Sequence, residues 1–487
     1  MSLPSHEIAA LLPLLLPALG GILILLLVAA ERDRGLGLEA TGTLAILALS
    51  AASALALIAQ GVREDLFDGS VRVDVRSLAF HLIFVTAAAL AVLTSMRALR
   101  DAAAGHGEFY ALLLFAVTGM TLMASTESLL TLFLGLEILS ISLYVLAGFT
   151  RDQTFAIEGA LKYFLLGAFS TGFVLYGIAL FYGGTGRIDL RGIAAQFQAA
   201  RGGPVDPLLL AAAALLLIGL AFKVAAVPFH FWAPDVYQGA LAPVAGFMAT
   251  GTKAAAFAAL LRVVTVALQE TPVKERWMAI ATILALLTMV VGNVAALAQQ
   301  NIKRMLAYSS VANAGYLLLA VAAGGATGNG AATVFFYLAA YVLMTSGAFA
   351  VTLLVGRSGE GDQGYAIASY GGLGRRRPAL AAVMTLFMLS LTGIPPTGGF
   401  MGKLYIFQDA VRAGLYVPAA VGLLASVIGA FVYLRVVVQI YFREAALTAP
   451  DTPASAPETA SLAAAALGTI GLGLFPNGLF ELARRLL

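Results

Sequence analysis

Long apolar runs alternate with short polar connectors along almost the whole chain. A helix needs about 20 apolar residues to cross the hydrocarbon core of a bilayer, and the pattern predicts an all-α integral membrane protein. About fourteen spans are expected, near residues 8–30, 38–60, 77–96, 108–125, 127–149, 154–183, 206–238, 240–268, 276–298, 301–323, 330–356, 378–410, 415–444 and 460–482.

The composition agrees with a chain that lies in lipid. Of 487 residues, 60% are hydrophobic and 11% are charged, whereas a soluble domain carries about 25% charged residues. The polar connectors at 61–76, 184–205, 357–377 and 445–459 are too short to hold a soluble domain. The first apolar run is too long for the apolar part of a signal peptide and lacks a basic leader, so we expect it to be a mature helix.

Charge and cysteine content exclude several classes of function. The net charge of +3 comes from scattered arginines rather than a basic run, so nucleic acid is not an expected partner. The absence of cysteine excludes disulfides and cysteine-ligated iron–sulfur clusters in this chain. The sequence also contains no metal-binding constellation, no nucleotide-binding loop and no nucleophile–base pair.

Ionisable residues interrupt several of the apolar runs. They are Glu137, Lys162, Lys223, Lys253 and Lys403. A lysine at mid-membrane depth costs roughly 2.5–3.5 kcal/mol on insertion scales, so each of these needs a partner, water or a function. A string of groups that can change charge, connected by water, is a proton path.

The five residues differ in their local partners. Lys162 has Glu158 four residues before it, the favourable order for an intrahelical ion pair, so it has either a structural or a proton-carrying role. The other lysines have no acidic residue three or four positions away, so their partners must come from other helices or from water. Ser140 and Tyr144 share the helix face of Glu137 and are placed to order water there.

One expected helix contains a proline in its middle. In FKVAAVPFHFWAPDVYQG, Pro228 removes a backbone donor and frees the carbonyl of Val224, next to Lys223. His230 follows the break and is interpreted either as a proton relay, since its unperturbed pKa is about 6.5, or as a satisfied core histidine. His81, in another helix, is expected to be structural.

A second expected helix is broken in the same way. In LTGIPPTGGFMGK, Pro395 and Pro396 free the carbonyls of Leu391 and Thr392, and Lys403 follows within two turns. Unpaired backbone inside a membrane is tolerated only where it is buried in protein or lines a wet cavity, and transporters use such breaks at ion sites. A single kink could merely shape packing, but two breaks, each beside a buried lysine, favour function.

The same segments resemble a known family, the antiporter-like membrane subunits of respiratory complex I and their Mrp-antiporter relatives. The resemblance is closest to the N-type subunit (subunit 2) of NADH:quinone oxidoreductase. The motifs that carry it lie between about 130 and 410 and read LFLGLEILSISLYVLAG, EGALKYFLLGAFSTGFVLYGIALFYGGTG, FKVAAVPFHFWAPDVYQGA, GTKAAAFAALLRV, QQNIKRMLAYSSVANAGY and LTGIPPTGGFMGKLYIF.

The resemblance implies a specific architecture. It implies two inverted five-helix repeats, at 108–268 (helices 4–8) and 276–444 (helices 9–13), in which helices 7 and 12 are broken. An N-terminal three-helix segment at 1–107 precedes them and a C-terminal helix at 460–487 follows. It also places both termini on the outer side of the membrane, in agreement with the arginines at 375–377, which favour a cytoplasmic loop.

The resemblance further implies roles for the charged residues. Glu137 would pair with Lys223, Lys253 would continue the path, and Lys403 would lead to the other half-channel. Lys162 also matches a family position. The sequence departs from the family at two places. Leu241 and Ala242 stand where the family has Pro-Thr, and Asn313 stands where related subunits often carry a histidine; asparagine cannot titrate. The role of Arg435 stays open between relay, lipid anchor and subunit contact.

The expected function is therefore a proton-translocating subunit of a complex I-type enzyme in a bacterial inner membrane. Its partners would be other membrane subunits, its transported ion the proton, and its energy redox chemistry elsewhere. No cofactor is expected in this chain; FMN and iron–sulfur clusters would lie in partner subunits. The alternatives are a stand-alone Mrp-type cation/proton antiporter subunit and a membrane scaffold whose charges only hold partners together.

Overall fold

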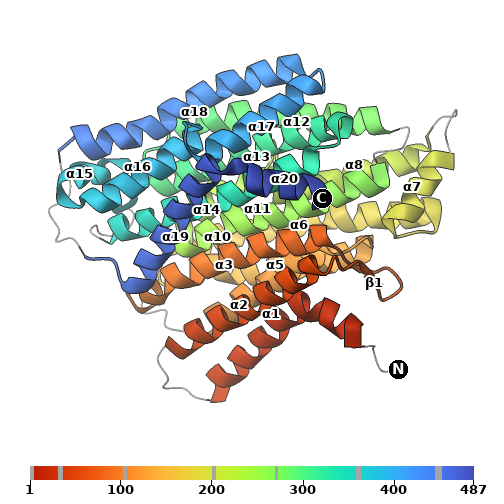
Figure 1. Ribbon diagram of the computed structural model, residues 1–487, viewed down its shortest axis with the longest axis horizontal. Coiled ribbons are helices and arrows are strands. Elements are labelled where there is room, and N and C mark those ends of the chain that lie inside the picture. Colours follow the sequence, from red (N-terminus) through yellow and green to blue (C-terminus); the bar gives the residue numbers. More distant parts are fainter. Residues whose placement is uncertain are drawn as a thin grey trace.

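Long helices run roughly parallel to one another through most of the molecule (Figure 1). The computed structural model describes residues 5–30, 37–101, 107–199, 205–268, 273–357, 364–444 and 452–486. The N-terminal part comprises α1 (Ser5–Ala30), α2 (Gly37–Ala59), a hairpin of β1 (Glu64–Leu66) and β2 (Val71–Val73), and α3 (Val75–Asp101). The hairpin is antiparallel and pairs Glu64 with Val73 and Leu66 with Val71.

The remaining helices follow in two groups. The first group is α4 (Glu108–Ala124), α5 (Leu129–Ala147), α6 (Thr154–Thr185), α7 (Leu190–Ala199), α8 (Pro207–Lys223), α9 (Trp232–Gly239), α10 (Ala242–Phe247) and α11 (Lys253–Arg262). The second is α12 (Lys274–Leu297), α13 (Ile302–Thr327), α14 (Gly330–Gly356), α15 (Leu373–Arg376), α16 (Pro378–Thr392), α17 (Gly398–Arg412), α18 (Tyr416–Phe442), α19 (Ala456–Leu474) and α20 (Pro476–Leu486).

The helix that contains α10 and α11 is continuous but changes its winding. Two π-helical segments, η1 (Met248–Thr252) and η2 (Val263–Leu268), precede and follow α11, so one helix runs from residue 242 to 268. Lys253 is the first residue after the first π segment. π segments inside α-helices are rare and frequently occur at functional sites.

The long helices run between two ends of the molecule. We call the end where β1 lies the hairpin end, and the opposite end, where α15 lies, the α15 end (Figure 1). At the hairpin end, Thr126 in the α4–α5 loop donates a hydrogen bond to the carbonyl of Ser70 (2.7 Å), and Ser128 pairs with Asp189 in an isolated β-bridge. At the α15 end, a bridge joins Asn301, before α13, to Ala366. These contacts tie the connectors at each end to one another.

Both expected breaks are present. α8 ends at Lys223 and α9 begins eight residues after Val224, while α16 ends at Thr392 and α17 begins at Gly398. Gly393 closes α16 with a φ of +89°, a left-handed conformation that glycine adopts without steric cost. Each proline-containing segment thus separates two half-helices, as the sequence predicted.

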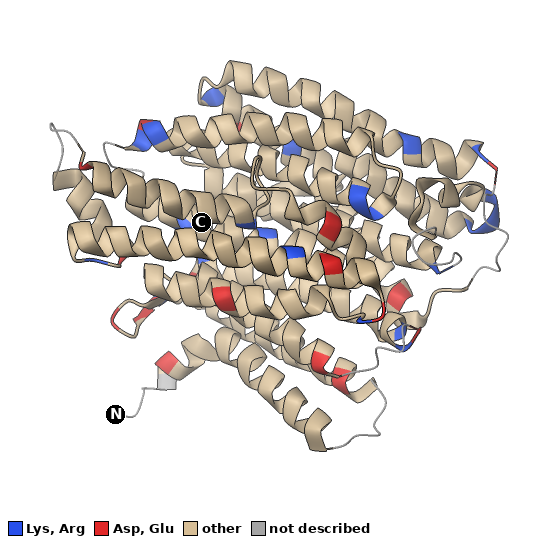
Figure 2. Ribbon diagram, turned by 180° about the vertical axis from the view of Figure 1, so that it is seen from behind, with Lys and Arg blue, Asp and Glu red and all other residues tan. Residues whose placement is uncertain are grey.

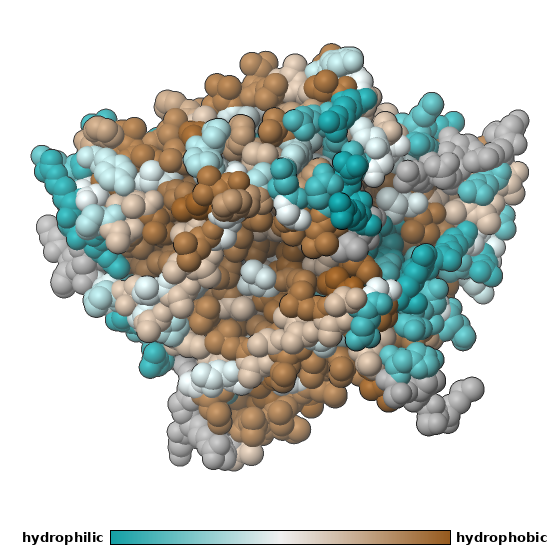
Figure 3. Space-filling model, in the orientation of Figure 1, coloured by the Kyte–Doolittle hydropathy of each residue, from teal (hydrophilic) through white to brown (hydrophobic). Residues whose placement is uncertain are grey.

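The outer surface is suited to lipid. Ten helices are long and apolar enough to cross a membrane, or eleven if the bent pair α19–α20 counts as one span. Apolar side chains cover most of the surface in view, while hydrophilic ones gather toward the two ends and in a band on the upper middle of this face (Figure 3). α13 and α14 are buried on nearly all sides and form the centre of the bundle. The all-α membrane fold is therefore confirmed.

Candidate functional site

Charged residues occur part-way along the helices as well as near their ends (Figure 2). Lys223, at the end of α8, is 3% exposed. Its Nζ donates to the hydroxyls of Ser140 (2.8 Å) and Tyr163 (3.2 Å). The Ser140 hydroxyl in turn donates to the carbonyl of Leu136 (2.5 Å). The described acceptors of Lys223 are therefore neutral side-chain oxygens.

Glu137 lies one turn before Ser140 on α5 and is half-buried. Its carboxylate makes no ion pair with Lys223 within 4 Å in the described structure. One of its oxygens, Oε1, is buried and has no hydrogen-bond partner among the described residues. Buried polar oxygens are ordinarily hydrogen-bonded, often by ordered water, so we expect a water molecule to bind this oxygen.

Aromatic rings enclose Lys223. Tyr163 stacks on Trp232 with ring centroids 4.6 Å apart, and Tyr144 meets Tyr163 edge-on at 4.9 Å. Tyr144 lies on the face of α5 that the sequence predicted. The Lys223 Nζ is 5.5 Å from the centre of the Tyr163 ring, close enough for a cation–π attraction.

Lys253 is 1% exposed and reaches from α11 to α13, where its Nζ donates to the main-chain carbonyl of Ser310. No carboxylate lies within ion-pair distance of it in the part of the chain that the structure describes. The helix break predicted near Lys223 has no counterpart here; instead the π segment before Lys253 changes the winding of its helix.

Lys403 is 6% exposed and binds the break of its own helix pair. Its Nζ donates to the carbonyls of Leu391 (2.8 Å) and Thr392 (3.0 Å), and to the hydroxyl of Ser426 (3.2 Å). These are the two carbonyls that the adjacent prolines were predicted to free. The centre of the Tyr316 ring lies 4.9 Å from Nζ. The ammonium at the second break is thus bound by two main-chain carbonyls and one hydroxyl.

A polar bridge lies between Lys253 and Lys403, and the sequence did not reveal it. The hydroxyls of Ser309 and Tyr433 are 2.6 Å apart. Asn313 donates to the carbonyl of Ser309 (2.9 Å) and accepts from the hydroxyl of Tyr337 (2.5 Å). Asn313 thus links two helices by hydrogen bonds, as a group that cannot itself take up a proton.

Lys162 lies apart from the buried lysines. It forms ion pairs with Glu158 (2.7 Å), as predicted, and with Asp235 on α9 (2.7 Å). Asp235 also pairs with Arg304 at 2.6 Å. The Lys162 side chain is 43% exposed in the isolated chain, so its charge is both paired and accessible.

His81 and His230 differ in their hydrogen-bond partners. His81 is fully buried, with its ring nitrogens 2.9 Å from the Ser50 hydroxyl and 2.8 Å from the Thr121 hydroxyl, and so joins three helices. His230 is 6% exposed, and its Nδ1 has no partner among the described residues. Between these two described residues, it is His230 that has a ring nitrogen available to bind water, so its role as a proton relay stays a proposal.

Arg435 caps a helix. From α18 its guanidinium donates to the carbonyls of Leu297 (2.7 Å), Ala296 (3.2 Å) and Gln299 (2.5 Å). The last carbonyls of an α-helix have no partner within the helix, and a cation there also favours the helix dipole. Among the three roles that the sequence left open, none predicted this contact with the end of α12.

A cluster of ion pairs at the hairpin end was also missed. Arg262 binds Asp74 (2.8 Å), while Arg72 and Arg191 approach Glu127 at 3.3 and 2.7 Å. Burial opposes ionisation of Asp74, but Arg262 outweighs it and holds the pKa of Asp74 below its usual value. Burial raises the pKa of Glu127 despite the arginines. These charges lie in or next to the ends of helices and strands, where charged residues are ordinarily solvated, so the sequence did not single them out.

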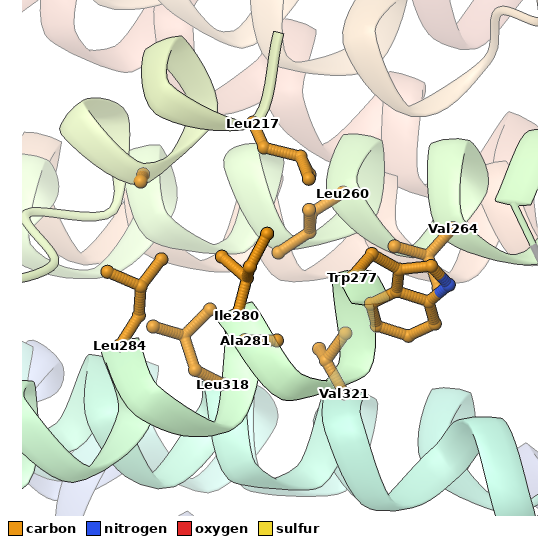
Figure 4. Close-up of a pocket in the computed structure, with 10 residues that line it drawn as sticks. Leu217, Leu260, Val264, Trp277, Ile280, Ala281, Leu284, Leu318 and Val321 are labelled. Atoms are coloured by element: carbon orange, nitrogen blue, oxygen red, sulfur yellow. The ribbon is translucent and has the colours of Figure 1, made fainter. Parts of the chain in front are cut away.

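An apolar hollow of about 30 Å³ lies between α8, α11, α12 and α13 (Figure 4). Leu217, Leu260, Ile280 and Val321 are among the side chains that point into it, and the indole of Trp277 closes one side. Apolar cavities of this kind stay dry. The hollow therefore offers no route for protons, and within the described ranges no group of three acidic, histidine or cysteine side chains is placed to bind a metal.

Comparison with known proteins places this geometry in a family. The sequence profile described as "NADH:quinone oxidoreductase/Mrp antiporter, TM" matches residues 126–429. The chain belongs to this family. It is 46% identical over 442 residues to NADH-quinone oxidoreductase subunit N of Trichlorobacter lovleyi, covering 91% of this chain and 89% of the relative. It is 45% identical to subunit N 1 of Solibacter usitatus, covering 92% and 90%. The predicted N-type resemblance is confirmed.

Solved structures agree with this family membership. A chain of respiratory complex I from Thermus thermophilus is 39% identical, with a TM-score of 0.81, covering 96% of this chain and 98% of that one. A chain of the Mrp complex from a Dietzia species has a TM-score of 0.84 at 23% identity, covering 98% and 96%. At that identity the Mrp similarity shows a shared fold only, whereas the complex I chain is similar in sequence as well.

Proposed function

We propose that the chain is the N-type, proton-translocating membrane subunit of a complex I-type NADH:quinone oxidoreductase. The proposal is supported by relatives that carry this subunit's name at about 45% identity over nine-tenths of the chain. The observation that carries it is the buried lysine at each of two broken helices, Lys223 and Lys403, with Lys253 between them.

The proposed mechanism is a stepwise shift of charge along these residues. A change in the charge or position of Glu137 alters the proton affinity of Lys223 through Ser140 and water. Lys223 then passes a proton to Lys253, and the polar bridge connects Lys253 to Lys403. Moving one charge against 100 mV costs about 2.3 kcal/mol, which corresponds to less than two pKa units, so modest electrostatic changes at each lysine suffice.

Two further residues complete the proposed path. His230, beside the first break, has a ring nitrogen free to bind water and is proposed as a relay. Lys162, with its paired but accessible charge, is proposed to tune the electrostatics near Lys223 from α6, on which Tyr163 also lies.

We also propose fourteen membrane crossings in two inverted five-helix repeats. To the ten long spans we add α4, the two broken helices and the bent pair α19–α20. The division 108–268 and 276–444 is supported by the position of the breaks: the broken helix is the fourth of five spans in each half. An odd number of spans per repeat inverts the second repeat. Both termini would then lie on the outer side of a bacterial membrane.

The chain would work without a cofactor of its own. It contains no cysteine, so FMN and iron–sulfur clusters are proposed for partner subunits of the assembly. The large apolar surface of α5 and α6, which carries the Glu158–Lys162 pair, is proposed to face lipid and neighbouring membrane subunits.

The decisive experiment compares Lys223→Ala with Lys274→Ala in the complete assembly purified through a tag on this chain. Lys274 lies at the start of α12, outside the path. We expect NADH-driven proton uptake into vesicles to fall at least tenfold in the first variant and to stay normal in the second, with normal subunit content in both. Normal proton uptake in Lys223→Ala would remove Lys223 from the path.

The same preparation separates the alternatives. Recovery of the chain without redox subunits, together with sodium-dependent proton exchange in liposomes, would favour the Mrp-type antiporter. Loss of partner subunits from Lys223→Ala, Lys253→Ala and Lys403→Ala, with normal proton flux in what remains, would favour a scaffold.

A further inference from the structure

A buried carboxylate on α17 takes no part in the path described above. Asp409 follows Lys403 by six residues, about 9 Å along the helix, and is 2% exposed. The hydroxyl of Thr333 donates to its Oδ2 (2.5 Å), and its nearest cation is Arg412 at 4.0 Å. A buried carboxylate without a close ion pair is costly, so its presence in a membrane helix requires an explanation.

Asp409 lies where the bundle meets the hairpin end. α16 starts directly after α15, so α17 ends at the opposite end of the molecule. α14 begins at that end too, because α13 starts beside Ala366 at the α15 end. Arg412, three residues after Asp409, is 63% exposed. Asp409 is therefore the last buried ionisable group on α17 before the surface.

A row of polar side chains on α14 connects Asp409 to the interior. Thr333, Tyr337, Tyr341 and Thr345 recur at intervals of four residues, and each is at most 2% exposed. Residues four apart lie on the same side of a helix, so the row points into the bundle. Tyr337 donates to Asn313 and thereby joins the row to the polar bridge between Lys253 and Lys403.

Three hydroxyls on or beside this row make no hydrogen bond of good geometry among the described residues. They belong to Tyr341 and Thr345 and to Ser310 on α13, although both Ser310 and Thr345 lie close to Tyr341. Ser310 is also the residue whose carbonyl accepts from Lys253. Buried polar groups are ordinarily hydrogen-bonded, and ordered water serves where the protein does not. The row therefore has the chemistry of a hydrated track.

We propose that Asp409 is the proton-release group of this chain: it receives protons from the Lys253–Lys403 segment through Tyr337 and Thr333 and delivers them to water at the hairpin end. The inference rests on the proposed function and extends it to the exit. Thr333 gives its hydroxyl proton to the Asp409 carboxylate and takes another proton from the interior side. Asp409 becomes a carboxylate again when its own proton passes to solvent beside Arg412.

The competing explanation is purely structural: the hydrogen bond between Thr333 and Asp409, which we call the staple, serves only to hold α14 against α17. The two roles separate at Asp409→Asn, because the asparagine amide oxygen still accepts from Thr333 but cannot carry a proton at neutral pH. Thr333→Val is the matched variant, which removes the staple and leaves the carboxylate. A staple predicts that Asp409→Asn behaves as wild type, while Thr333→Val and Asp409→Ala lower thermal stability.

The test measures proton uptake per NADH oxidised in vesicles that hold the complete assembly, with Lys403→Ala in parallel. We expect Asp409→Asn to lower it at least fivefold, with normal subunit content and thermal midpoint. We also expect Asp409→Ala to regain at least threefold on addition of sodium formate, a small carboxylate that can replace the missing one. If Asp409→Asn does not assemble, the formate response of Asp409→Ala decides alone.

Two results would overturn the inference. One is Asp409→Asn pumping within a factor of two of wild type while Lys403→Ala is inactive, which would leave the proposed function intact. The other is an inactive Asp409→Ala that formate does not revive. Normal pumping in both Lys403→Ala and Asp409→Asn would instead contradict the proposed function itself.

Discussion

Each of the two broken helices binds a buried lysine ammonium, but the two use different acceptor groups. At the first break, Lys223 donates to the hydroxyls of Ser140 and Tyr163, which come from two other helices. At the second, Lys403 donates to Leu391 and Thr392, carbonyls of the half-helix that precedes its own. One lysine thus depends on neighbouring side chains, and the other on the backbone that proline exposed.

This difference has a physical consequence. A hydroxyl can accept from an ammonium and can also rotate and donate to a neutral amine, so the pocket of Lys223 accommodates both charge states. A carbonyl can only accept, and its direction is fixed by the backbone. Lys403 is therefore held mainly by two fixed carbonyls, with the Ser426 hydroxyl as its one adaptable acceptor. Lys223, in contrast, responds to changes in α5 and α6, where Glu137 and Lys162 lie.

The largest expected effect comes from removing the lysines. Lys403→Ala and Lys223→Ala should each lower proton uptake at least tenfold. Lys403→Ala should also lower the thermal midpoint more, because two buried carbonyls lose their donor, at about 1–3 kcal/mol for each unsatisfied group, whereas the Ser140 and Tyr163 hydroxyls can find other partners. A thermal scan of the detergent-purified assembly checks this, and equal midpoints would remove the proposed contrast.

The next effect concerns the acceptors alone. The double variant Ser140→Ala/Tyr163→Phe removes both described acceptors of Lys223 and should reduce proton uptake about tenfold, equivalent to about 1.4 kcal/mol. Ser426→Ala removes one of three acceptors of Lys403 and should reduce it less than twofold. Initial rates in vesicles at matched subunit content provide the measurement. A larger loss of proton uptake in Ser426→Ala than in the double variant would mean that Lys403, and not Lys223, depends on adaptable side-chain acceptors.

A smaller effect is expected at the glycine that closes α16. A Cβ at Gly393 would lie 3.1 Å from Cδ of Lys403, and the position has a φ of +89°. Gly393→Ala should displace the ammonium from its carbonyls and halve proton uptake. Gly414→Ala is the control, since its φ of +75° imposes similar backbone strain with no atom within 4 Å. Similar activity in the two variants would show that strain, and not contact with Lys403, is responsible.

The smallest effect concerns a carboxylate that is firmly paired, in contrast to both lysines. The pKa of Asp74 is held below 3.8, so its ion pair with Arg262 stabilises the folded chain above that pH and is lost as pH falls through the lowered value. Asp74→Asn should lower the thermal midpoint by roughly 2–4 °C at pH 7 and pH 5, and the difference should vanish only below about pH 3.8.

The control for this variant is Asp68→Asn in the exposed turn of the hairpin, which should leave the midpoint unchanged. A loss of the Asp74 effect already at pH 5 would mean that the folded pKa is raised instead of lowered.

The sequence predicted the membrane fold and the two breaks because both follow from local chemistry. Apolar length determines a span, and proline frees a carbonyl wherever it interrupts a helix, so the contacts of Lys403 with Leu391 and Thr392 were foreseeable. The pairing of Lys162 with Glu158 was foreseeable for the same reason, since it depends on helical spacing.

What the sequence did not predict depends on distant segments. Asp235, which also binds Lys162, is 73 residues away along the chain, and Asp74 and Arg262 are 188 apart. Asp409 lies at the end of the span predicted at 378–410, and no pattern in the sequence singled it out. The polar row on α14 did have a local signal, a hydroxyl-bearing residue at every fourth position from Thr333. This signal becomes meaningful only once α14 is known to be buried on nearly all sides.

The π segment before Lys253 sets the direction in which that lysine faces. Each residue turns an α-helix by about 100°, and a π turn contains one residue more than the α turn it replaces. Loss of one residue between Met248 and Thr252 would leave the rest of the helix intact but swing Lys253 away from the carbonyl of Ser310. The contact between α11 and α13 therefore depends on the direction in which Lys253 points around its helix axis. Relatives that lack the extra residue would need their lysine at a neighbouring position.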